Sequence, residues 1–558
     1  MSEANAEYEA TKRRKQPTLP EALSYVEAAA SPSADRTAEM LYHLGSALKE
    51  GPRPSRGDEE RVVDAISKLT GLLLESSSNS SSSNMPRIEQ LDGRYLSQSS
   101  WALSQVRSVR GTAVRTLGLA IAEQALHGEV MKAEGWRNWS GVLYGLAKAG
   151  ICCKDSEQVQ QLFACAVTQR LPQLPAQKQG CTAQDVSNTF HATVTAGYSG
   201  SLEPLVLEVA GDLSRVMEGA TAQAWANVLW ACAKQGESVS GRLGQSMPVL
   251  LREGAASIAG LAKSGSAMSQ DMSNALWALS KLGWYDASVY STLSSAFLQK
   301  SNDAKPQECS NMLIGCAEAC HWDSSMEGLA EFVIKQSEQQ LGKWKEQELS
   351  NSLYAWAVLT AAGPPAASGS PSFKVMAQQL FGQVSKGGPS AFVDLHLRQL
   401  YLAHQVAVYG KLPGEGLSAD AIQLEKVVAS YRGMLRAMQT AVKNSQGSRG
   451  AIEQQVVEAL QRVGYQVKVA QVVEMNGLKE VAPLLVQGVA VRVMSVDDYF
   501  HSPPDLLSGS KQIHNVLASW VCGSSIVVPE AEWAGLKGDP QQQQAYVAQR
   551  MQEVVSRG

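Results

Sequence analysis

An amide, an aromatic ring and an ammonium group recur in this sequence at a fixed spacing. In residues 270–283, Asn274, Trp277 and Lys281 occupy positions i, i+3 and i+7, which places them on one face of a helix. Such a set could read the edge of a base, stack on its ring and neutralise a phosphate. The spacing therefore points to recognition of single-stranded nucleic acid.

The pattern occurs nine times, and we number each copy from the residue that aligns with Asn274. Position 0 is asparagine in Asn188, Asn227, Asn274, Asn311 and Asn351, and looser copies begin at Glu39, Gln98, Gly141 and Arg398. Position +3 is aromatic in Tyr42, Trp101, Tyr144, Trp230, Trp277, Tyr354 and Tyr401, and is His191 and Ile314 in the other two copies. Position +7 is lysine in Lys148, Lys234 and Lys281.

A purely structural interpretation competes with the chemical one. A repeated asparagine can equally hydrogen-bond the loop of a neighbouring copy, and the pattern favours neither role. A repeated tryptophan or tyrosine can fill the seam between copies, which is the interpretation that we favour for these rings. The lysines are expected to be solvated, and a phosphate contact must form at a solvated position.

The elements that carry the pattern are predicted to be helices. Residues 270–283 have an apolar stripe at helical spacing, with Ser269 as the expected N-cap and Gly283 as the expected left-handed stop. A second amphipathic helix is expected after the pattern in residues 156–170, 202–217 and 286–300. The copies recur at a period near forty residues, which is typical of helix-hairpin repeats that stack into an α-solenoid of undetermined hand.

The predicted organisation is a mainly α-helical chain with a small α/β domain at its end. Residues 1–19 form a polar tail, and residues 20–410 form the solenoid, interrupted by a serine-rich loop at 76–84 and a Pro/Ser/Gly loop at 363–372. Residues 411–450 are predicted to be a helix and a linker. The remaining residues, 451–558, form the α/β domain, with helices at 452–463, 506–520 and 541–555 and strands at 465–473, 484–494 and 525–528.

Composition excludes several classes of protein. The apolar fraction of 44% allows a packed core, and the net charge of −4 gives no global basic field, so any nucleic-acid surface must be local. Nine irregularly spaced cysteines argue against a disulfide scaffold. No apolar run suits a transmembrane helix. The polar N-terminus resembles neither a secretory signal nor, with its early acidic residues, a transit peptide.

One cluster could in principle bind a metal. Cys316, Cys320 and His321 lie close together in sequence, but Cys316 falls at a core position of the pattern and Cys320 falls where four other copies have glycine. No Cys-x-x-Cys pair supports zinc, and no nucleotide-binding loop or Gly-x-Ser-x-Gly turn is present. We therefore expect no metal and no cofactor.

Two resemblances give the patterns a context. The helix with its Asn-x-Leu-Trp-Ala-Leu-x-x-Leu-Gly core resembles the octotricopeptide repeat of green-algal organelle proteins, over roughly two-thirds of the chain. Residues 491–500, 509–517 and 526–533, which end in Val-Pro-x-x-x-Trp, resemble the RAP domain of organelle RNA-binding proteins and the FAST-kinase-like family. The resemblance implies an organelle protein, of the chloroplast in preference to the mitochondrion, that binds single-stranded RNA.

The second resemblance also implies an alternative activity. RAP domains are similar to restriction-endonuclease-like folds, whose acidic residues hold a divalent metal. The family's two acidic positions are here Arg492 and Met494, so an RNA endonuclease is not the expected activity, although Asp497 and Asp498 could form a displaced site. Lys511 and His514 suit phosphate contacts better than catalysis.

Together these patterns are interpreted as a sequence-selective single-stranded RNA-binding protein of an organelle that controls transcripts after transcription. It would act in mRNA stability, rRNA or mRNA processing, splicing or translation, with single-stranded organelle RNA and other RNA-processing or ribosomal proteins as partners and no membrane. A ribosome-associated scaffold is a further alternative. The residues predicted to contact RNA are Asn188, Asn227, Asn274, Asn311, Asn351, Tyr144, Trp230, Trp277, Tyr354, Lys148, Lys234, Lys281, Arg492, Lys511 and His514.

Overall fold

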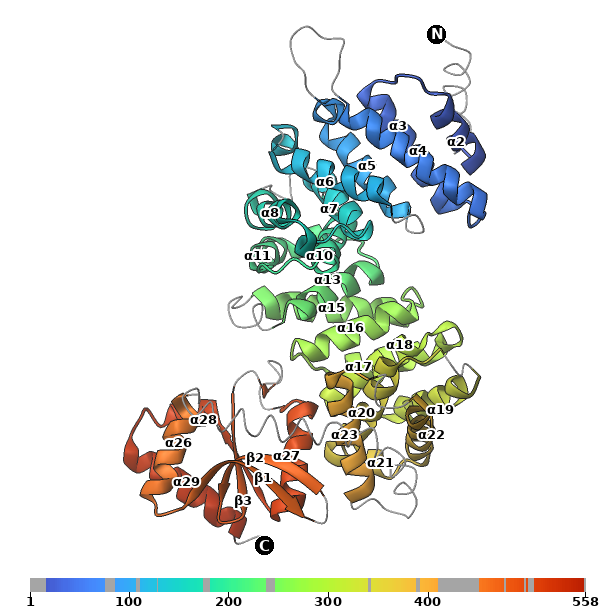
Figure 1. Cartoon of the computed structure of the whole chain (residues 1–558). Helices are drawn as coiled ribbons and strands as arrows, with labels where there is room; N and C mark the ends of the chain where they lie inside the picture. Colours follow the sequence, from blue (N-terminus) through green and yellow to red (C-terminus); the bar gives the residue numbers. More distant parts are fainter. Residues whose placement is uncertain are drawn as a thin grey trace. The chain divides into compact units, whose positions relative to one another are not determined.

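The computed structural model of the chain forms two compact units, Met1–Gly254 and Ala255–Gly558 (Figure 1). It describes residues 17–75, 86–106, 111–127, 129–173, 181–236, 246–339, 343–387, 392–409, 451–475, 478–495, 498–499 and 506–555. The predicted serine-rich loop at 76–84 and the predicted helix and linker at 411–450 lie outside these residues, as does most of the predicted tail. The described part is mainly helical, with a small four-stranded sheet near the C-terminus.

Every copy of the sequence pattern lies on a helix of its own, and we call these nine the pattern helices. In the first unit they are α3 (Ala34–Glu50), α5 (Gly93–Gln105), α7 (Trp136–Lys148), α10 (Ala183–Thr195) and α13 (Ala222–Gln235). In the second unit they are α16 (Ser269–Lys281), α18 (Pro306–Glu318), α20 (Glu346–Ala362) and α23 (Asp394–Tyr409). Within each unit, consecutive pattern helices pack against one another.

The helices between the pattern helices form a second layer. They are α4 (Arg56–Leu74), α6 (Thr112–His127), α8 (Glu157–Cys165), α11 (Glu203–Gly211), α17 (Ala287–Gln299), α19 (Ser324–Gln339) and α22 (Pro371–Gly387). In this layer α4 packs on α6 and α6 on α8, and in the second unit α17 packs on α19 and α19 on α22. The three predicted second helices correspond to α8, α11 and α17, although the segment predicted at 202–217 breaks at Asp212 into α11 and α12 (Leu213–Val216).

Further elements complete the helical part, among them α15 (Ser246–Lys263), an 18-residue helix between α13 and α16. The others are α2 (Leu19–Ala28), α9 (Leu171–Gln173), α21 (Pro365–Ser368), η1 (Arg87–Gln90), η2 (Glu129–Ala133), η3 (Cys153–Asp155), η4 (Ala166–Arg170) and η5 (Ser301–Asp303). The Pro/Ser/Gly segment at 363–372 thus contains the short helix α21 and the start of α22, because proline at the first position of a helix loses no hydrogen bond. Among the described helices, none is both long and apolar enough to cross a bilayer.

Small residues at position +4 of seven pattern helices, all but α3 (His43) and α23 (Leu402), allow close packing against a neighbouring pattern helix. A Cβ added at Gly145 would lie 2.3 Å from the carbonyl carbon of Ser100, and one added at Gly315 would lie 3.1 Å from that of Leu276. The same position is alanine in Ala102, Ala192, Ala231, Ala278 and Ala355. A larger side chain at this seam would push the helices apart, since protein interiors are packed at crystal-like density.

The ends of the pattern helices follow two local rules. Gly283 has a φ of +66°, which confirms the predicted left-handed stop. The predicted N-cap is wrong: Ser269 is the first helical residue, and Met268 precedes it. The backbone N–H of Met268 instead donates to the Asp271 carboxylate at 3.1 Å. An acid at the third position of the helix thus accepts from the N–H of the residue that precedes the helix.

The C-terminal α/β region begins with α26 (Ala451–Arg462) and continues through β1 (Val467–Met475), β2 (Leu478–Val486), β3 (Val489–Met494), α27 (Gly509–Cys522), β4 (Ser525–Pro529), α28 (Glu530–Gly535) and α29 (Pro540–Val555). The segment 484–494 was predicted to be one strand, and this is wrong. It contains the end of β2, a two-residue turn and β3. The turn residues Gln487 and Gly488 have φ values of +51° and +88°, the left-handed geometry of a tight hairpin turn.

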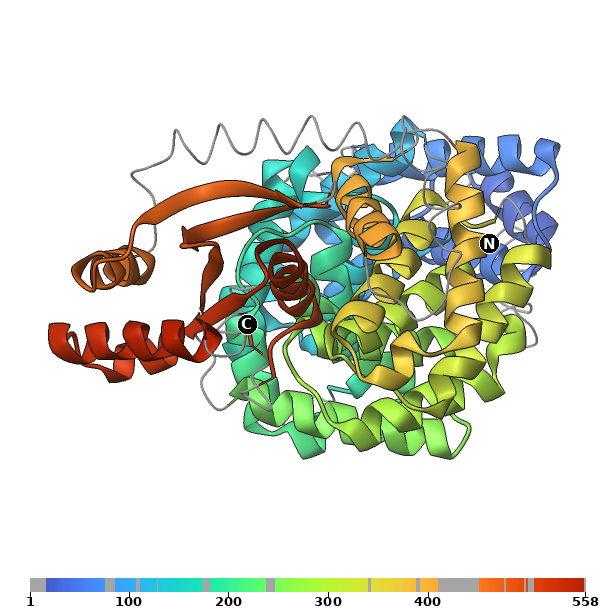
Figure 2. The ribbon, with the colours of Figure 1, turned by 90° about the horizontal axis from the view of Figure 1, so that it is seen from below.

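The sheet has the strand order β1-β2-β3-β4, with the first two pairs antiparallel and β3 parallel to β4. Because side chains alternate across a strand, Leu484 and Val486 join a core with α26 and α29, whereas Leu485 packs against the opposite cluster around Ala518 of α27. Helices α26 and α29 therefore cover one face of the sheet and α27 covers the other (Figure 2).

Candidate nucleic-acid interface

Positions 0, +3 and +7 of the pattern helices form the surface that we call the stripe. In the first unit, three pairs of rings at +3 on consecutive pattern helices contact each other. The ring centroids of Tyr42 and Trp101 are 5.2 Å apart, those of Tyr144 and His191 are 5.8 Å apart, and those of His191 and Trp230 are 5.6 Å apart. Each of these rings remains partly exposed. They fill the seam, as the structural interpretation favoured, without being sealed from solvent.

Cations lie over this ladder of rings. The Nζ atoms of Lys148 and Lys234 are 5.5 Å and 6.0 Å from the ring centroids of Tyr144 and Trp230, one helical turn before them. Lys49 of α3 lies 5.7 Å from the ring of Trp101 on the following pattern helix. A cation within about 6 Å of a ring centroid is attracted by the ring's electron-rich face. The predicted grouping of an aromatic ring and an ammonium therefore exists in the first unit.

The stripe of the second unit differs in both burial and charge. Trp277 is partly exposed, whereas the side chains at +3 on α18, α20 and α23 are buried: Ile314 is 5% exposed, Tyr354 7% and Tyr401 3%. Burial also raises the pKa of Tyr354 well above the ordinary value of 10, with the Glu318 carboxylate acting in the same direction. The phenol of Tyr354 is therefore held neutral.

The third predicted lysine has a different environment from the other two. Lys281 Nζ lies 3.2 Å from Oε1 of Glu318, whose side chain is only 7% exposed. Glu318 is itself the +7 residue of α18, so a carboxylate stands where the pattern elsewhere has lysine. The pair contributes no net positive charge to this part of the stripe. Glu318 was not among the predicted contact residues, although its place at +7 follows from the spacing of the pattern.

The amides at position 0 mostly connect neighbouring pattern helices. Asn227 donates to the hydroxyl of Ser187 at 3.1 Å, and Asn311 donates to the amide oxygen of Asn274 at 3.3 Å. The amide oxygen of Asn351 accepts from Gln399 on α23 at 2.9 Å. Asn188, by contrast, accepts a hydrogen bond from Gln184 of its own helix. The partners lie on adjacent pattern helices rather than in the loops that the sequence interpretation considered.

The predicted contact residues of the α/β region also take part in protein contacts. Lys511 Nζ is 2.7 Å from the Asp498 carboxylate, and His514 lies 3.2 Å from the guanidinium of Arg398 on α23. Arg492 is partly buried on β3, opposite Val527 of β4. Lys511 and His514 are thus engaged with other protein side chains, and Asp497 lies outside the described residues.

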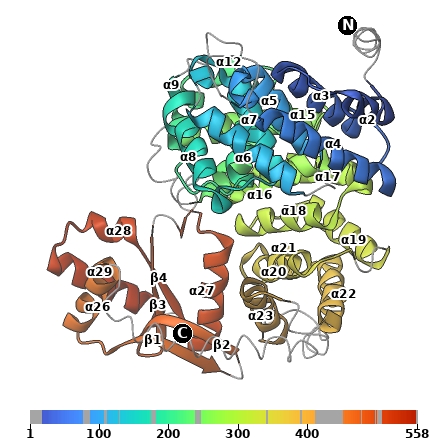
Figure 3. The ribbon, with the colours of Figure 1, turned by 45° about the horizontal axis from the view of Figure 1, so that its top comes forward.

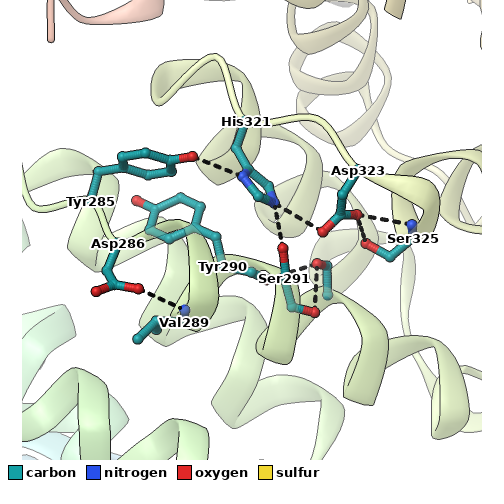
Figure 4. A network of polar contacts seen from close by, with 9 residues as sticks. Tyr285, Asp286, Val289, Tyr290, Ser291, His321, Asp323 and Ser325 are labelled. Atoms are coloured by element: carbon teal, nitrogen blue, oxygen red, sulfur yellow. Dashed lines mark hydrogen bonds and ion pairs between the residues drawn. The ribbon is translucent and has the colours of Figure 1, made fainter. Parts of the chain in front are cut away.

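His321 lies in a buried polar network beside the stripe (Figure 4). Tyr285 contacts its Nδ1 at 3.1 Å, while Asp323 and Ser291 both contact its Nε2, at 3.2 Å and 3.5 Å. A hydrolytic triad needs the carboxylate and the nucleophile on different ring nitrogens, so Ser291 and Asp323, which share Nε2, do not form one with His321. Hydrogen bonding from His321, then from Ser291 and Ser325, lowers the pKa of Asp323 despite its burial.

The cysteines near His321 have no metal-site geometry. Within the residues that the structure describes, no group of three or more His, Cys, Asp or Glu side chains could hold an ion. Burial raises the pKa of the Cys316 thiol and raises that of Cys320 to about 12, which disfavours the thiolate that binds metals. Cys320 has a φ of +49°, the left-handed conformation that the corresponding Gly283 adopts. It is therefore a helix stop, as its register predicts.

Comparisons with known proteins do not assign this chain to a family. No known protein-family model matches this sequence, and no curated protein is significantly similar to it. The candidate interface therefore stands on the arrangement of its own residues.

Proposed function

We propose that this protein binds single-stranded RNA along the stripe of its pattern helices. The observation that carries the proposal is the ladder of Tyr144, His191 and Trp230 with Lys148 and Lys234 over its rings. Aromatic rings stack on bases of any sequence, and a cation beside each ring can neutralise the adjoining phosphate. A net charge of −4 leaves such local clusters as the places where a polyanion would bind.

The finer interpretation follows from the sequence resemblances. The pattern helices pack against one another within each unit and alternate along the chain with other helices. This arrangement is consistent with an octotricopeptide-type α-solenoid. The sheet with α26 and α29 on one face and α27 on the other is consistent with a RAP-type domain. On these resemblances we propose an organelle factor, of the chloroplast in preference to the mitochondrion, that acts in RNA stability, processing, splicing or translation, alone or with RNA-processing or ribosomal proteins.

Crosslinking followed by sequencing of the bound RNA tests the proposal most directly. We expect enriched single-stranded segments, with crosslinks on peptides from α7, α10 and α13. A fluorescence anisotropy titration of purified protein with the enriched RNA gives the affinity and its dependence on salt. Crosslinks confined to other surfaces, or an affinity for duplex equal to that for single strands, would refute the proposed interface.

We also propose that the protein does not cut the RNA it binds. The two carboxylate oxygens of Asp498 accept from Lys511 at 2.7 Å and from the backbone N–H of Ser495 at 2.8 Å. An acid used in this way, beside an ammonium, is poorly placed to hold a divalent cation. End-labelled RNA should remain intact with magnesium or manganese. Metal-dependent cleavage that is lost in Asp498→Asn or Asp497→Asn would establish the endonuclease alternative.

A further inference from the structure

Helix α27 of the α/β region packs on the stripe of the second unit. It packs against α20 and α18, and Figure 3 shows it beside these helices. Gly509, the first residue of α27, is buried so tightly that an added Cβ would lie 2.1 Å from the carbonyl oxygen of Ala317 and 2.7 Å from Cγ1 of Val358. Val358 is the +7 residue of α20. Glycine is required at 509 because only a residue without a Cβ lets the backbone of α27 come this close to the Ala317 carbonyl of α18.

Polar contacts fix the same end of α27. The backbone N–H of Ser510 donates to Oε2 of Glu318 at 3.2 Å, while the other oxygen of Glu318 binds Lys281. A carboxylate at a helix N-terminus is favourable because the exposed N–H groups carry partial positive charge. One turn further along, His514 meets Arg398, the position 0 residue of α23. The helix thus contacts positions of the stripe on three consecutive pattern helices, α18, α20 and α23.

The ring at position +3 of α20 is buried where α27 packs against this helix. Tyr354, whose hydroxyl is hydrogen-bonded to Ser510, is 7% exposed, whereas Trp230 at the same position in the first unit is partly exposed. Any strand of RNA laid along α18, α20 and α23 would need the space that α27 occupies. It would also need the charge of Lys281, which Glu318 neutralises.

We propose that α27 is a built-in competitor for RNA, docked on the stripe of the second unit by Gly509 and Glu318. The inference rests on the proposed function. With α27 docked, RNA can bind only the pattern helices that α27 leaves uncovered; the positions of the stripe on α18, α20 and α23 become available when α27 leaves. The apparent affinity for long RNA is then lowered by the fraction of molecules in which α27 is docked.

A pair of glycine substitutions in the full-length protein tests this. Gly509→Ala places a methyl group against the Ala317 carbonyl and releases α27. Gly535→Ala, in helix α28 of the same region, adds the same methyl group where nothing lies within 4 Å. Hydrogen exchange of the α27 and α20 amides, measured by mass spectrometry, reports docking without RNA. We expect faster exchange in Gly509→Ala and wild-type exchange in Gly535→Ala.

Anisotropy titrations with single strands of randomised sequence report the competition. For a strand of about 30 nucleotides, Gly509→Ala should bind up to about tenfold more tightly than wild type, and a strand of about 10 nucleotides should show no gain. Glu318→Gln, which keeps the shape of the side chain and removes its charge, should change both readouts in the same direction by less. Glu318→Gln also tests the proposal if the Gly509→Ala protein does not fold.

The outcomes separate the two proposals. Wild type that binds RNA, with a released variant that binds the long strand no more tightly, overturns the competition and leaves RNA binding intact. Unchanged hydrogen exchange in both Gly509→Ala and Glu318→Gln overturns the docking contact itself. Absence of RNA binding in wild type and in every folded variant overturns the proposed function, and the competition with it.

Discussion

The two units carry the same sequence pattern and use it differently. In the first unit, rings at +3 form a partly exposed ladder with lysines over Tyr144 and Trp230. In the second unit, the equivalent side chains from α18 onward are buried, and the lysine at +7 is paired with Glu318. A repeat thus fixes where a side chain lies on its helix, but what packs against the helix decides whether that side chain can meet a ligand.

The largest expected effect concerns the buried ring of the second unit. Replacing Tyr354 by alanine should lower the free energy of unfolding by about 3–5 kcal/mol, because it removes a large side chain that is fully packed and leaves a cavity. Chemical denaturation followed by circular dichroism measures this. Tyr354→Phe keeps the ring and should cost much less. A mild effect of Tyr354→Ala would mean that this position is not a packing position and would erase the contrast between the units.

The matching substitution in the first unit should act on RNA instead. Trp230→Ala should weaken RNA binding by about 1–3 kcal/mol for the base that loses its stacking partner, with a smaller loss of stability than Tyr354→Ala because the ring is partly exposed. Trp230→Phe, which retains an aromatic face, is the control and should keep most of the affinity. If Trp230→Ala destabilises the fold as much as Tyr354→Ala does and leaves RNA affinity unchanged, the ladder is purely structural.

The buried network of the second unit gives a pH-dependent prediction. Asp323 has its pKa lowered by hydrogen bonds from His321 and neighbouring hydroxyls, so its ionised form stabilises the fold above the ordinary carboxyl pKa of 3.8. That contribution should be lost as the pH falls below 3.8 towards the folded-state value. Asp323→Asn should therefore cost about 1–3 kcal/mol at neutral pH and little at pH below the folded-state pKa. Equal destabilisation at all pH values would contradict the charge-based explanation.

The lysines offer a direct comparison of the units at one position. For a single strand, the log–log slope of affinity against salt falls by about 0.7 for each phosphate that the protein no longer neutralises, so Lys148→Ala with Lys234→Ala should reduce it by about 1.4. Lys281→Ala should leave the slope unchanged, because its charge is already paired with Glu318. Anisotropy titrations over a range of salt concentrations measure both. A larger change from Lys281→Ala than from the double variant would reverse the assignment of the RNA face.

The smallest expected effect concerns a helix end. Cys320 holds the left-handed conformation that its equivalents occupy as glycine, and an L-residue with a Cβ is strained there. Cys320→Gly should raise the free energy of unfolding by about 0.5–1 kcal/mol, the relief of strain being partly offset by greater freedom of the unfolded chain. Gly283→Ala, the reverse change one repeat earlier, should be destabilising. If both changes destabilise, Cys320 has a role beyond the stop.

The periodicity of the sequence was sufficient to predict the helices and which side chains share a helix face. Apolar residues at helical spacing must turn to one side, so the period of the pattern was enough to place a helix at each copy and to put Trp230 and Lys234 on one face. Local rules also predicted the stop at Gly283, since the left-handed region disfavours other residues. The hairpin at Gln487 was missed because both flanking strands are rich in valine, and periodicity does not mark where one strand ends.

The tertiary structure alone decided which copies of the stripe are covered. Nothing local marks Tyr354 as a buried ring and Tyr144 as a partly exposed one, since each follows a leucine and precedes a small residue. Tyr354 lies on a helix that packs against α27, which is more than a hundred residues away in the chain and donates from the Ser510 N–H to Glu318. Burial and ion pairing depend on such distant contacts, because desolvation and Coulomb energies are set by what surrounds a side chain in space rather than in sequence.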